Sequence, residues 1–420
     1  MRCAAEERLR GIPWHALGGL GPALDAPLAQ VLAGGPASAV LARFLRERPA
    51  LPAEARTAVA EAVLGVALWR RRLRAQLGDA DAPPRALLGA LLRDLAGRSD
   101  AAALAGLAKD ALPPPRPPPA GLADRFSLPD WLADELRAAA GPEAEPLANA
   151  LDLPGPVCLR VNTLRVTPPA LAARLRSEGV VTRPGALAPA CLVVESPRPN
   201  VYGLRAHQEG LFEVQDEASQ LAGALAGARP GDEVLDLCAG AGGKTLLLAC
   251  AAGAGGRVHA ADLDAGRLAR LRLRAARAGA GEIVAVHGAE APAALAADRV
   301  LVDAPCSELG ALRRGPDARW RVDPSTFAGL PALQLGLLLR AARHVRPGGT
   351  LAYATCTFRR EEDEAVALAF EAADGRFARV LPPAPPEVVT PDGFLRTWPH
   401  RHGTDGFFGA VWTRSDPREP

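Results

Sequence analysis

The sequence predicts an α/β fold built on a mostly parallel sheet wound with helices on both faces, preceded by two smaller domains. Three observations predict it. After about residue 230, short apolar runs alternate regularly with longer amphipathic segments. Before about residue 110 the pattern is helical throughout, and between these regions short strand-like and helical pieces mix. Strands that alternate with helices indicate parallel strands joined by right-handed crossovers.

The first region, residues 1–112, is expected to be an all-helical domain. Ala, Leu and Val recur at three- and four-residue spacing through 53–77 and 84–95, which is the period of a helix face. The proline-rich stretch 113–121 is typical of a stiff, extended interdomain linker. The helical region is either a scaffold without chemistry of its own or an RNA-docking domain, and the scaffold is the favoured interpretation.

Residues 122–225 are expected to form a small α+β module. A short helix is expected to open near Ser127–Trp131, and 169–178 has helical periodicity. The strand-like pieces are 157–161 and 191–195. Such mixing within about a hundred residues is typical of α+β modules.

Residues 226–416 are expected to carry the large sheet. Apolar runs predict strands at 233–237, 257–261, 283–287, 299–303 and 350–354. Helical periodicity separates them at 244–251, 265–278, 327–345 and 361–373. The tail at 394–398 and 407–413 predicts a closing hairpin.

Composition restricts the function classes. The 420-residue chain has a formal net charge of +2, so any basic surface must be local. Lys109 and Lys244 are its only lysines, so nearly every basic residue is an arginine. A high arginine content therefore says little about function in this chain, whereas a lysine at position 244 is informative. The seven cysteines include no Cys-x-x-Cys pair, which argues against disulfides and zinc. No apolar run reaches the roughly 18 residues of a membrane span, and no signal-peptide core opens the chain. We expect a cytoplasmic monomer without metal.

The first strand of the large sheet runs into a glycine-rich turn and then a helix. Glycines let the backbone adopt positive φ and approach a ligand at the carboxyl end of a strand. The turn alone fits a phosphate, a dinucleotide, S-adenosylmethionine or a plain tight turn. The residues proposed to contact the cofactor are Cys238, Ala239, Gly240, Ala241, Gly242, Gly243 and Lys244.

The next strand favours S-adenosylmethionine. It ends in Asp262, and an acid there accepts hydrogen bonds from ribose hydroxyls. NAD remains an alternative on these two features, although the turn lacks the Gly-x-Gly-x-x-Gly spacing. Asp264 is better explained as the cap of the helix that begins near residue 265.

Two later strand ends carry Asp303 and Cys306, and Cys356. Neighbouring parallel strands end side by side, so we expect both thiols to face one pocket beside the cofactor. A thiolate that adds to carbon 6 of cytosine makes carbon 5 nucleophilic, a carboxyl group at nitrogen 3 stabilises the developing charge, and a second thiol can act as base. Because thiolate is the reactive form, at least one of these cysteines should have a pKa below the free value of about 8.5.

The remaining cysteines fit structural roles. Cys158, Cys191 and Cys250 are expected to be small core hydrophobes, which is the usual fate of a cysteine within a strand or helix. Cys238 lies in the glycine-rich turn and is expected to lend its backbone to the cofactor.

At these residues the chain resembles the RsmB/NOP/Sun-type RNA cytosine-5 methyltransferases, from about Phe126 to the C-terminus. The resemblance implies a Rossmann-like class I methyltransferase domain with a mostly parallel, seven-stranded sheet, Cys356 as nucleophile, Cys306 as the thiol that aids product release, and Asp303 at the cytosine. The helices before it resemble, more weakly, the NusB-like RNA-binding domain of the 16S ribosomal RNA members, best at 63–70. The matching segments are 126–131, 159–164, 214–219, 234–245, 303–306, 353–356 and 404–408.

Three positions depart from the family pattern. Gly240-Ala241 replaces the usual Ala-Pro, which changes the stiffness of the turn. Ala289 stands where an acid would contact the adenine region, unless Glu290 substitutes from the next position. Glu308 occupies a position that is normally small, and a carboxylate there is expected to raise the pKa of Cys306 and to repel RNA phosphate.

An arginine-rich segment follows Cys306 and is expected to contact RNA, because arginine neutralises phosphates and an aromatic ring stacks on a splayed base. A solvated loop in an arginine-rich protein is the alternative. The residues expected to bind RNA are Arg313, Arg314, Arg319, Trp320 and Arg321.

Other functions remain open at this point. A DNA cytosine-5 methyltransferase would use Cys306 as nucleophile, but no Glu-Asn-Val follows it and Cys356 would have no role. A non-catalytic RNA-binding ribosome-assembly factor is favoured only by Glu308 and Ala289. A small-molecule methyltransferase would need neither the preceding domains nor the thiols.

Overall fold

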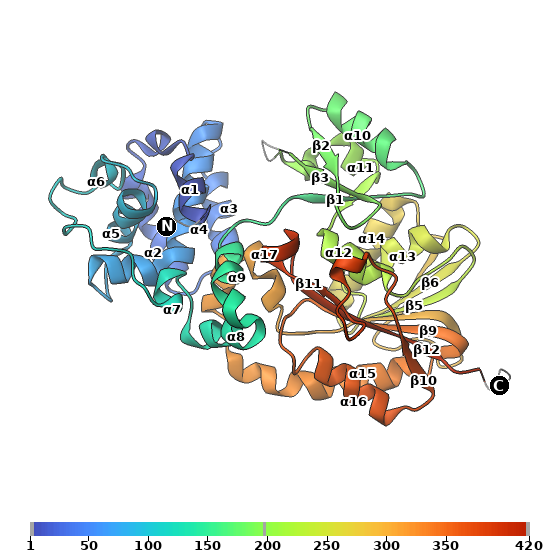
Figure 1. Cartoon of the computed structure of the whole chain (residues 1–420). Coiled ribbons are helices and arrows are strands. Elements are labelled where there is room, and N and C mark those ends of the chain that lie inside the picture. Colours follow the sequence, from blue (N-terminus) through green and yellow to red (C-terminus); the bar gives the residue numbers. More distant parts are fainter. Residues whose placement is uncertain (1–3, 196–198, 417–420) are drawn as a thin grey trace. The chain divides into compact units, whose positions relative to one another are not determined.

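The computed structural model describes residues 4–195 and 199–416, so Cys3 lies outside the described residues. The chain divides into two compact units. The first comprises residues 1–154 together with 312–324, and the second comprises 155–311 and 325–420. Figure 1 shows both units and labels most of their helices and strands.

The first unit is helical, as predicted, and is organised around the long helix α4 (Ala53–Leu77), whose predicted bounds are confirmed. Pro52 precedes the first turn, and Gly78 ends the helix in the left-handed conformation (φ +71°) that glycine adopts without strain. The other helices are α1 (Ala4–Arg10), α2 (Asp25–Leu32), α3 (Ala37–Arg46), α5 (Pro84–Ala90), α6 (Ala101–Leu104), α7 (Leu122–Arg125), α8 (Asp130–Ala140) and α9 (Ala144–Leu151).

The domain boundary expected at residue 121 is displaced. Residues 113–120 contain no helix or strand, but they connect two parts of the same unit, because α7 to α9 lie in the first unit. The side chain of Arg71 on α4 explains part of this association, since it bonds the carboxylates of Asp124 (2.6 Å) and Asp130 (2.7 Å). Residues 312–324, expected within the catalytic domain, also belong to this unit.

The second unit begins with the predicted α+β module. Its four strands are β1 (Cys158–Val161), β2 (Thr182–Pro184), β3 (Cys191–Val194) and β4 (Phe212–Val214), all antiparallel in the order β2-β3-β1-β4. The helices are α10 (Pro168–Ser177), α11 (Arg205–Gln208) and α12 (Glu217–Ala224). Leu159, Leu171 and Phe212 form part of its apolar core.

The large sheet has the order β10-β12-β9-β8-β5-β6-β7, with β11 paired to β12 outside this path. Strands β7, β6, β5, β8 and β9 are mutually parallel. Strand β12 runs antiparallel to its neighbours β9 and β10, so β10 has the same direction as the five parallel strands. The sheet is mostly parallel and seven-stranded as predicted, with β11 as an additional strand; β11 and β12 form the predicted hairpin. The bounds are β5 (Glu233–Leu237), β6 (Arg257–Ala261), β7 (Val284–Val286), β8 (Ala297–Asp303), β9 (Val345–Thr355), β10 (Phe377–Val380), β11 (Leu395–Thr397) and β12 (Phe407–Arg414).

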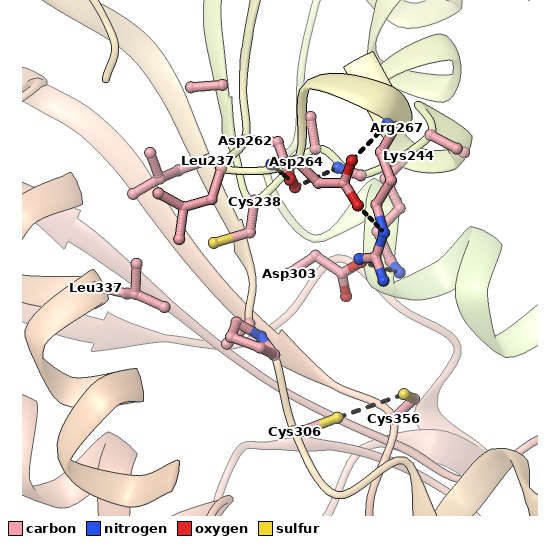
Figure 2. A pocket seen from close by; sticks show the side chains of 18 of the residues that line it. Leu237, Cys238, Lys244, Asp262, Asp264, Arg267, Asp303, Cys306, Leu337 and Cys356 are labelled. Atoms are coloured by element: carbon pink, nitrogen blue, oxygen red, sulfur yellow. Dashed lines mark hydrogen bonds and ion pairs between the residues drawn. The ribbon is translucent and has the colours of Figure 1, made fainter. Parts of the chain in front are cut away.

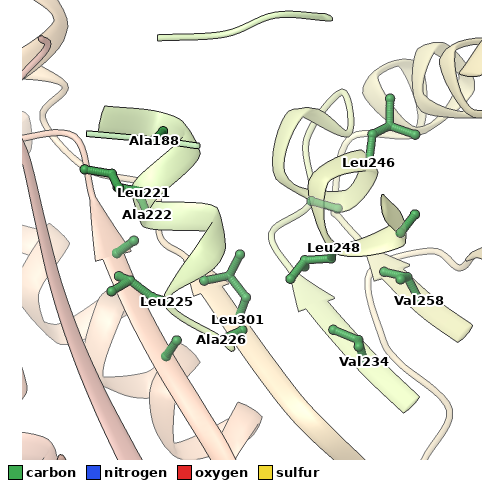
Figure 3. Packing of buried hydrophobic residues seen from close by; sticks show 14 of the residues in the cluster. Ala188, Leu221, Ala222, Leu225, Ala226, Val234, Leu246, Leu248, Val258 and Leu301 are labelled. Atoms are coloured by element: carbon green, nitrogen blue, oxygen red, sulfur yellow. The ribbon is translucent and has the colours of Figure 1, made fainter. Parts of the chain in front are cut away.

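Helices cover both faces of this sheet (Figure 1). On one face α12 packs Leu221 and Leu225 near Leu301 of β8, and α13 packs Leu248 near Val234 of β5 (Figure 3). On the other face α15 and α16 cover residues such as Leu235 and Val300. The helices are α13 (Gly243–Ala252), α14 (Ala265–Ala278), α15 (Leu330–Ala342), α16 (Glu364–Ala373) and the short α17 (Pro399–His402).

This winding determines where polar side chains gather. Because the five parallel strands point the same way, the residues that follow their carboxyl ends meet at one edge of the sheet. Cys238 follows β5, Asp262 follows β6, and Cys356 follows β9. Within the described residues, no helix combines the length and apolar character needed to cross a bilayer.

Candidate active site

The glycine-rich turn after β5 has a backbone that few side chains tolerate. Cys238, Gly240 and Gly242 all have positive φ (72°, 54° and 86°). A Cβ on Gly242 would lie 2.1 Å from a methyl carbon of Leu271, so α14 packs directly against the turn. The N–H groups of Cys238 and Ala239 both donate to the carbonyl of Ala261 at 2.9 Å. The turn is therefore held in one strained conformation next to the end of β6, as is common at ligand sites.

Asp262 is tied to this turn. Its carboxylate accepts hydrogen bonds from the backbone N–H of Gly240 and of Asp264, each at 2.8 Å. Asp264 accepts from the N–H of Arg267 at 2.9 Å and caps α14, so its predicted role is confirmed. The two acids, two residues apart, therefore have separate tasks (Figure 2).

These residues line one cavity of about 600 Å³, a size typical of cofactor sites. The cavity unites every catalytic and cofactor residue expected from the sequence except Gly242, which acts through the shape of the turn. The expected residues that line it are Cys238, Ala239, Gly240, Ala241, Gly243, Lys244, Asp262, Asp303, Cys306 and Cys356.

The two thiols lie side by side at one end of this cavity (Figure 2). The Sγ atoms of Cys306 and Cys356 are 3.4 Å apart. The register of β8 and β9, which pairs Asp303 with Ala354, brings the two strand ends together. The N–H of Gly310 donates to the carbonyl of Cys356 at 2.9 Å and fixes the loop that carries Cys306.

The expectation that at least one thiol of this site has a lowered pKa is not met at Cys306. The neighbouring Cys356 thiol and burial raise the pKa of Cys306 well above its usual value. The Cys356 thiol, and not the Glu308 carboxylate, is the largest cause of this rise, and a hydrogen bond from the backbone N–H of Glu308 opposes it. Glu308 itself has positive φ (57°), which is unusual for a residue with a side chain.

Lys244 and Asp303 form an ion pair on the wall of the cavity, with Nζ 2.7 Å from Oδ2. Burial disfavours the charged lysine, but the Asp303 carboxylate outweighs it and raises the pKa of Lys244. The ammonium also lies 5.0 Å from the ring centroid of Phe407. The pair keeps a positive charge and a carboxylate beside the thiols.

A buried acid that sequence reasoning missed holds the Cys306 loop. The Glu362 side chain is fully buried and accepts from the N–H of Ser307 (2.9 Å) and from Nε2 of Gln334 (3.1 Å). Gln334 Nε2 also donates to the carbonyl of Pro305 at 2.9 Å. These bonds fix both neighbours of Cys306, yet no local pattern could have predicted a partner 55 positions away.

The region after β7 differs from the family pattern, as the sequence indicated. Ala289 lines the cavity and offers no carboxylate. Glu290 pairs with Arg340 (3.1 Å), which lines the cavity, while Glu290 is not among the lining residues. Glu290 therefore approaches the site only through Arg340.

The arginine-rich segment requires a correction. Arg319 is fully buried in an ion pair with Asp152 at 2.8 Å, so the expected RNA contact is wrong for this residue. Arg313 is also buried, 7% exposed. Arg314 is exposed, Arg321 pairs with Asp317 (3.0 Å), and Trp320 is half-buried.

The cysteines expected to be structural lie away from the cavity. Cys158 and Cys191 are buried, and Cys250 donates its thiol to Oδ1 of Asn162 at 3.3 Å. Burial and nearby carboxylates raise the pKa of Cys238 to about 12. A thiol with a raised pKa is a poor nucleophile, so the side chain of Cys238 is not a candidate for the chemical step, and its backbone contact with the cofactor stays a prediction.

Comparison with protein families identifies two regions. The model described as 16S rRNA methyltransferase RsmB/F matches residues 224–413. A second model, the RsmF/B-like ferredoxin-like domain, matches residues 128–201. It covers strands β1, β2 and β3 of the four-stranded module but not β4, and it also includes α8 and α9 of the first unit.

Curated relatives carry related names. The probable ribosomal RNA small subunit methyltransferase B of Synechocystis is 34% identical over 301 residues, which is 69% of this chain and 67% of that protein. The ribosomal RNA small subunit methyltransferase B of Thermus thermophilus is 35% identical over 311 residues, 74% of this chain and 71% of its own. The chain thus spans about two thirds of the length of the relatives it matches.

Solved structures share the fold. The crystal structure of PH0851 superposes with a TM-score of 0.76 at 25% identity and covers 96% of this chain and 99% of that one. A methyltransferase homologue from Pyrococcus horikoshii, also 25% identical, has a TM-score of 0.59 and covers 70% of this chain and 97% of that one. The first similarity therefore extends over both units.

Proposed function

The chain belongs to the RsmB/F family of 16S rRNA methyltransferases, and on that premise we propose that it methylates carbon 5 of a cytosine in ribosomal RNA through a covalent bond to Cys356. One observation carries the proposal. Two thiols lie 3.4 Å apart at the end of a cavity that also contains the cofactor turn. Methylation of an oxygen or an exocyclic nitrogen has no use for a pair of thiols, whereas methylation of carbon 5 needs a nucleophile and a base.

The cofactor is S-adenosylmethionine, and the residues present fit it. The glycine-rich turn and Asp262 present backbone and a carboxylate at the carboxyl ends of β5 and β6, where a nucleoside is recognised. Leu263, 84% exposed, and Leu333, 49% exposed, lie on the cavity lining. These apolar side chains would be covered by a flat ring. When bound, the cofactor supplies an electrophilic methyl group.

We assign the first step to Cys356. Its thiolate forms the S–C6 bond, and the electron pair of the C5=C6 double bond shifts so that carbon 5 becomes nucleophilic and negative charge develops towards nitrogen 3. The Lys244–Asp303 pair would stabilise this charge through a hydrogen bond and a nearby ammonium. Because the pair is mostly buried, its effect would be stronger than in water.

We assign the last step to Cys306. Before reaction the thiol of Cys356 keeps the pKa of Cys306 high, so Cys306 holds its proton while Cys356 attacks. Once the sulfur of Cys356 is bonded to carbon 6, that influence ends and Cys306 can release its proton to water. The Cys306 thiolate then takes the proton from carbon 5, the C5=C6 bond re-forms, and Cys356 leaves as thiolate. One proton is released per methyl group added.

Alanine variants of the two cysteines test this assignment. Each is incubated with S-adenosylmethionine and 16S rRNA from a strain that lacks the protein, with Cys250→Ala as the control. We expect Cys306→Ala to accumulate a covalent protein–RNA adduct on a denaturing gel, Cys356→Ala to form none, and Cys250→Ala to behave as wild type.

Two results would contradict the proposal. An adduct that depends on Cys306 instead of Cys356 would indicate the chemistry of a DNA-type cytosine-5 enzyme. Absence of methyl transfer by the wild-type protein, with RNA binding retained, would indicate a non-catalytic assembly factor.

A further inference from the structure

The first unit contains a second cavity, of about 500 Å³, which we call the arginine pocket. Its walls come from the last two turns of α4 and from the segment 312–324, two parts of the same compact unit. The side chains that give it its character are Arg70, Arg71, Arg74, Asp79 and Trp320. None of the catalytic residues described above contributes to it.

Two of these arginines have no carboxylate partner among the described residues. Arg70 and Arg74 lie one helical turn apart, so their charges repel each other. Burial and the charge of Arg74 lower the pKa of Arg70 to about 10, which leaves it a cation at neutral pH. By contrast, Arg71 is neutralised by two carboxylates and Arg72 by Glu6. Arg70 and Arg74, which have no carboxylate partner, therefore lie on the same side of α4.

Trp320 supplies the opposite wall. The guanidinium carbon of Arg70 lies 4.1 Å from the centroid of the indole ring, and the indole N–H has no hydrogen-bond partner among the described residues. Trp320 is also firmly positioned, because its neighbour Arg319 is fixed by Asp152 and Asp317 accepts the N–H of Ala37 at 3.0 Å. The pocket is thus pre-organised, which lowers the entropic cost of binding a ligand.

The proline-rich stretch adds a third cation. A Cβ built on Gly78 would lie 2.1 Å from a terminal nitrogen of Arg116, so Arg116 reaches from the centre of this stretch to the C-terminal end of α4. That end carries the negative pole of the helix dipole, which favours the arginine. Arg116 is exposed, and its guanidinium therefore lies next to Gly78 on the pocket lining.

We propose that the arginine pocket binds the phosphodiester backbone of the RNA substrate, at a site separate from the catalytic cavity. This inference rests on the proposed function, which makes RNA the ligand. Uncompensated guanidinium groups are stabilised by phosphates, with which they form paired, charge-assisted hydrogen bonds. An indole ring beside them is typical of surfaces that hold single-stranded RNA. The one acid that lines the pocket, Asp79, accepts the N–H of Asp81 at 2.9 Å, and no ion pair joins it to Arg70 or Arg74 within the described residues.

A matched pair of double variants tests the proposal in the full-length protein. Arg70→Gln with Arg74→Gln removes two charges from the pocket, and Arg43→Gln with Arg46→Gln removes two exposed charges from α3 in the same unit. Binding of a 16S rRNA transcript is measured over a series of salt concentrations. We expect the pocket variant to bind roughly tenfold more weakly and its salt slope to fall by about 1.4, the value for two phosphate contacts on single strands. The control should bind as wild type.

A further variant and a competition experiment distinguish the ways in which the proposal could fail. Arg70→Lys with Arg74→Lys keeps both charges but loses the paired hydrogen bonds, so its salt slope should stay near that of wild type while its affinity lies between those of wild type and the Gln variant. A melting temperature of the Gln variant equal to that of wild type excludes misfolding as the cause. If wild type does not bind the transcript, the proposed function fails together with this inference. If wild type binds and methylates while the pocket variant binds equally tightly, only the inference is overturned. Competition by poly-glutamate as strong as that by a single-stranded RNA would also overturn it, in favour of an acidic protein partner.

Discussion

The sulfur atoms of Cys306 and Cys356 are 3.4 Å apart, close enough to act on neighbouring carbons of one pyrimidine. The distance exceeds the roughly 2.05 Å of a disulfide, so both are free cysteines in this structure. The two sulfur atoms would have to approach each other by about 1.4 Å to form a disulfide, which rotation of the two side chains can supply. The arrangement that suits covalent catalysis therefore makes the site sensitive to oxidants.

We predict that diamide inactivates the enzyme by joining these two thiols. The oxidant takes two protons and two electrons from the pair, and Cys356 can no longer attack. Methyl transfer should be lost and then restored by dithiothreitol. Peptide mapping should find Cys306 linked to Cys356, and Cys306→Ala should form no such link. Loss of activity without this cross-linked peptide would count against the prediction.

Asp262 and Asp264 allow a second prediction, because they are close in sequence and differ in task. Asp262→Ala removes the acceptor of the Gly240 N–H and the proposed ribose contact, so the affinity for S-adenosylmethionine should fall at least tenfold. Asp264→Ala removes only the cap of α14, so it should lower the melting temperature slightly and leave the affinity for S-adenosylmethionine unchanged. Isothermal calorimetry and thermal unfolding of both variants would check this. Equal losses of cofactor affinity would contradict it.

Asp236 makes stability depend on pH. Burial and the nearby Asp303 carboxylate raise the pKa of Asp236 to about 7, although the 2.6 Å hydrogen bond that Thr245 donates to its carboxylate lowers this pKa. In the unfolded chain an aspartate has a pKa of about 3.9. The folded state therefore binds the proton more tightly, and stability that is present at low pH is lost as the pH rises towards 7.

Because of this group, the free energy of unfolding of the wild-type protein should fall by roughly 2 to 3 kcal/mol between about pH 5 and about pH 8. Asp236→Asn stays neutral at every pH and keeps an acceptor for Thr245, so its stability should change less over the same range. Urea unfolding of both proteins at the two pH values would measure the difference. Parallel pH profiles would show that another group is responsible.

The catalytic unit could be predicted from the sequence because its signals are local. Apolar runs mark the strands, the bounds of β5, β6 and α14 agree with prediction, and parallel strands bring their ends to one edge. Cys306 and Cys356, 50 positions apart, could be expected to meet for this reason alone. The sheet topology therefore brings residues that are distant in the sequence together in one site.

Contacts made by single side chains could not be predicted in this way. Glu362 holds the Cys306 loop through a backbone N–H, and nothing in its surrounding sequence distinguishes it from an exposed helix-start acid. The sequence predicts that the arginine-rich segment contacts RNA, with a solvated loop as the alternative, yet residues 312–324 pack within the helical unit. Burial of a charge depends on a partner elsewhere in the chain, here Asp152 for Arg319, and single-sequence patterns carry no record of such pairs.

That buried pair gives the last prediction. The Arg319 guanidinium bonds Asp152 at 2.8 Å with both side chains fully buried, and burial raises the pKa of Asp152 to about 6 even though Arg319 opposes the rise. Arg319→Met or Asp152→Leu alone leaves one buried charge without its partner and should cost about 3 to 5 kcal/mol. The double variant leaves none, so it should cost far less than the sum.

Unfolding in urea across this four-protein cycle measures the coupling, and RNA binding by the double variant separates structure from recognition. Arg321→Met serves as the control, since its ion pair with Asp317 is partly exposed and should contribute less than about 1 kcal/mol. If Arg319 has only a structural role, the folded double variant binds the 16S rRNA transcript as tightly as wild type. Additive losses of stability, or RNA affinity lost with the Arg319 charge despite native stability, would restore a role in RNA binding to this residue.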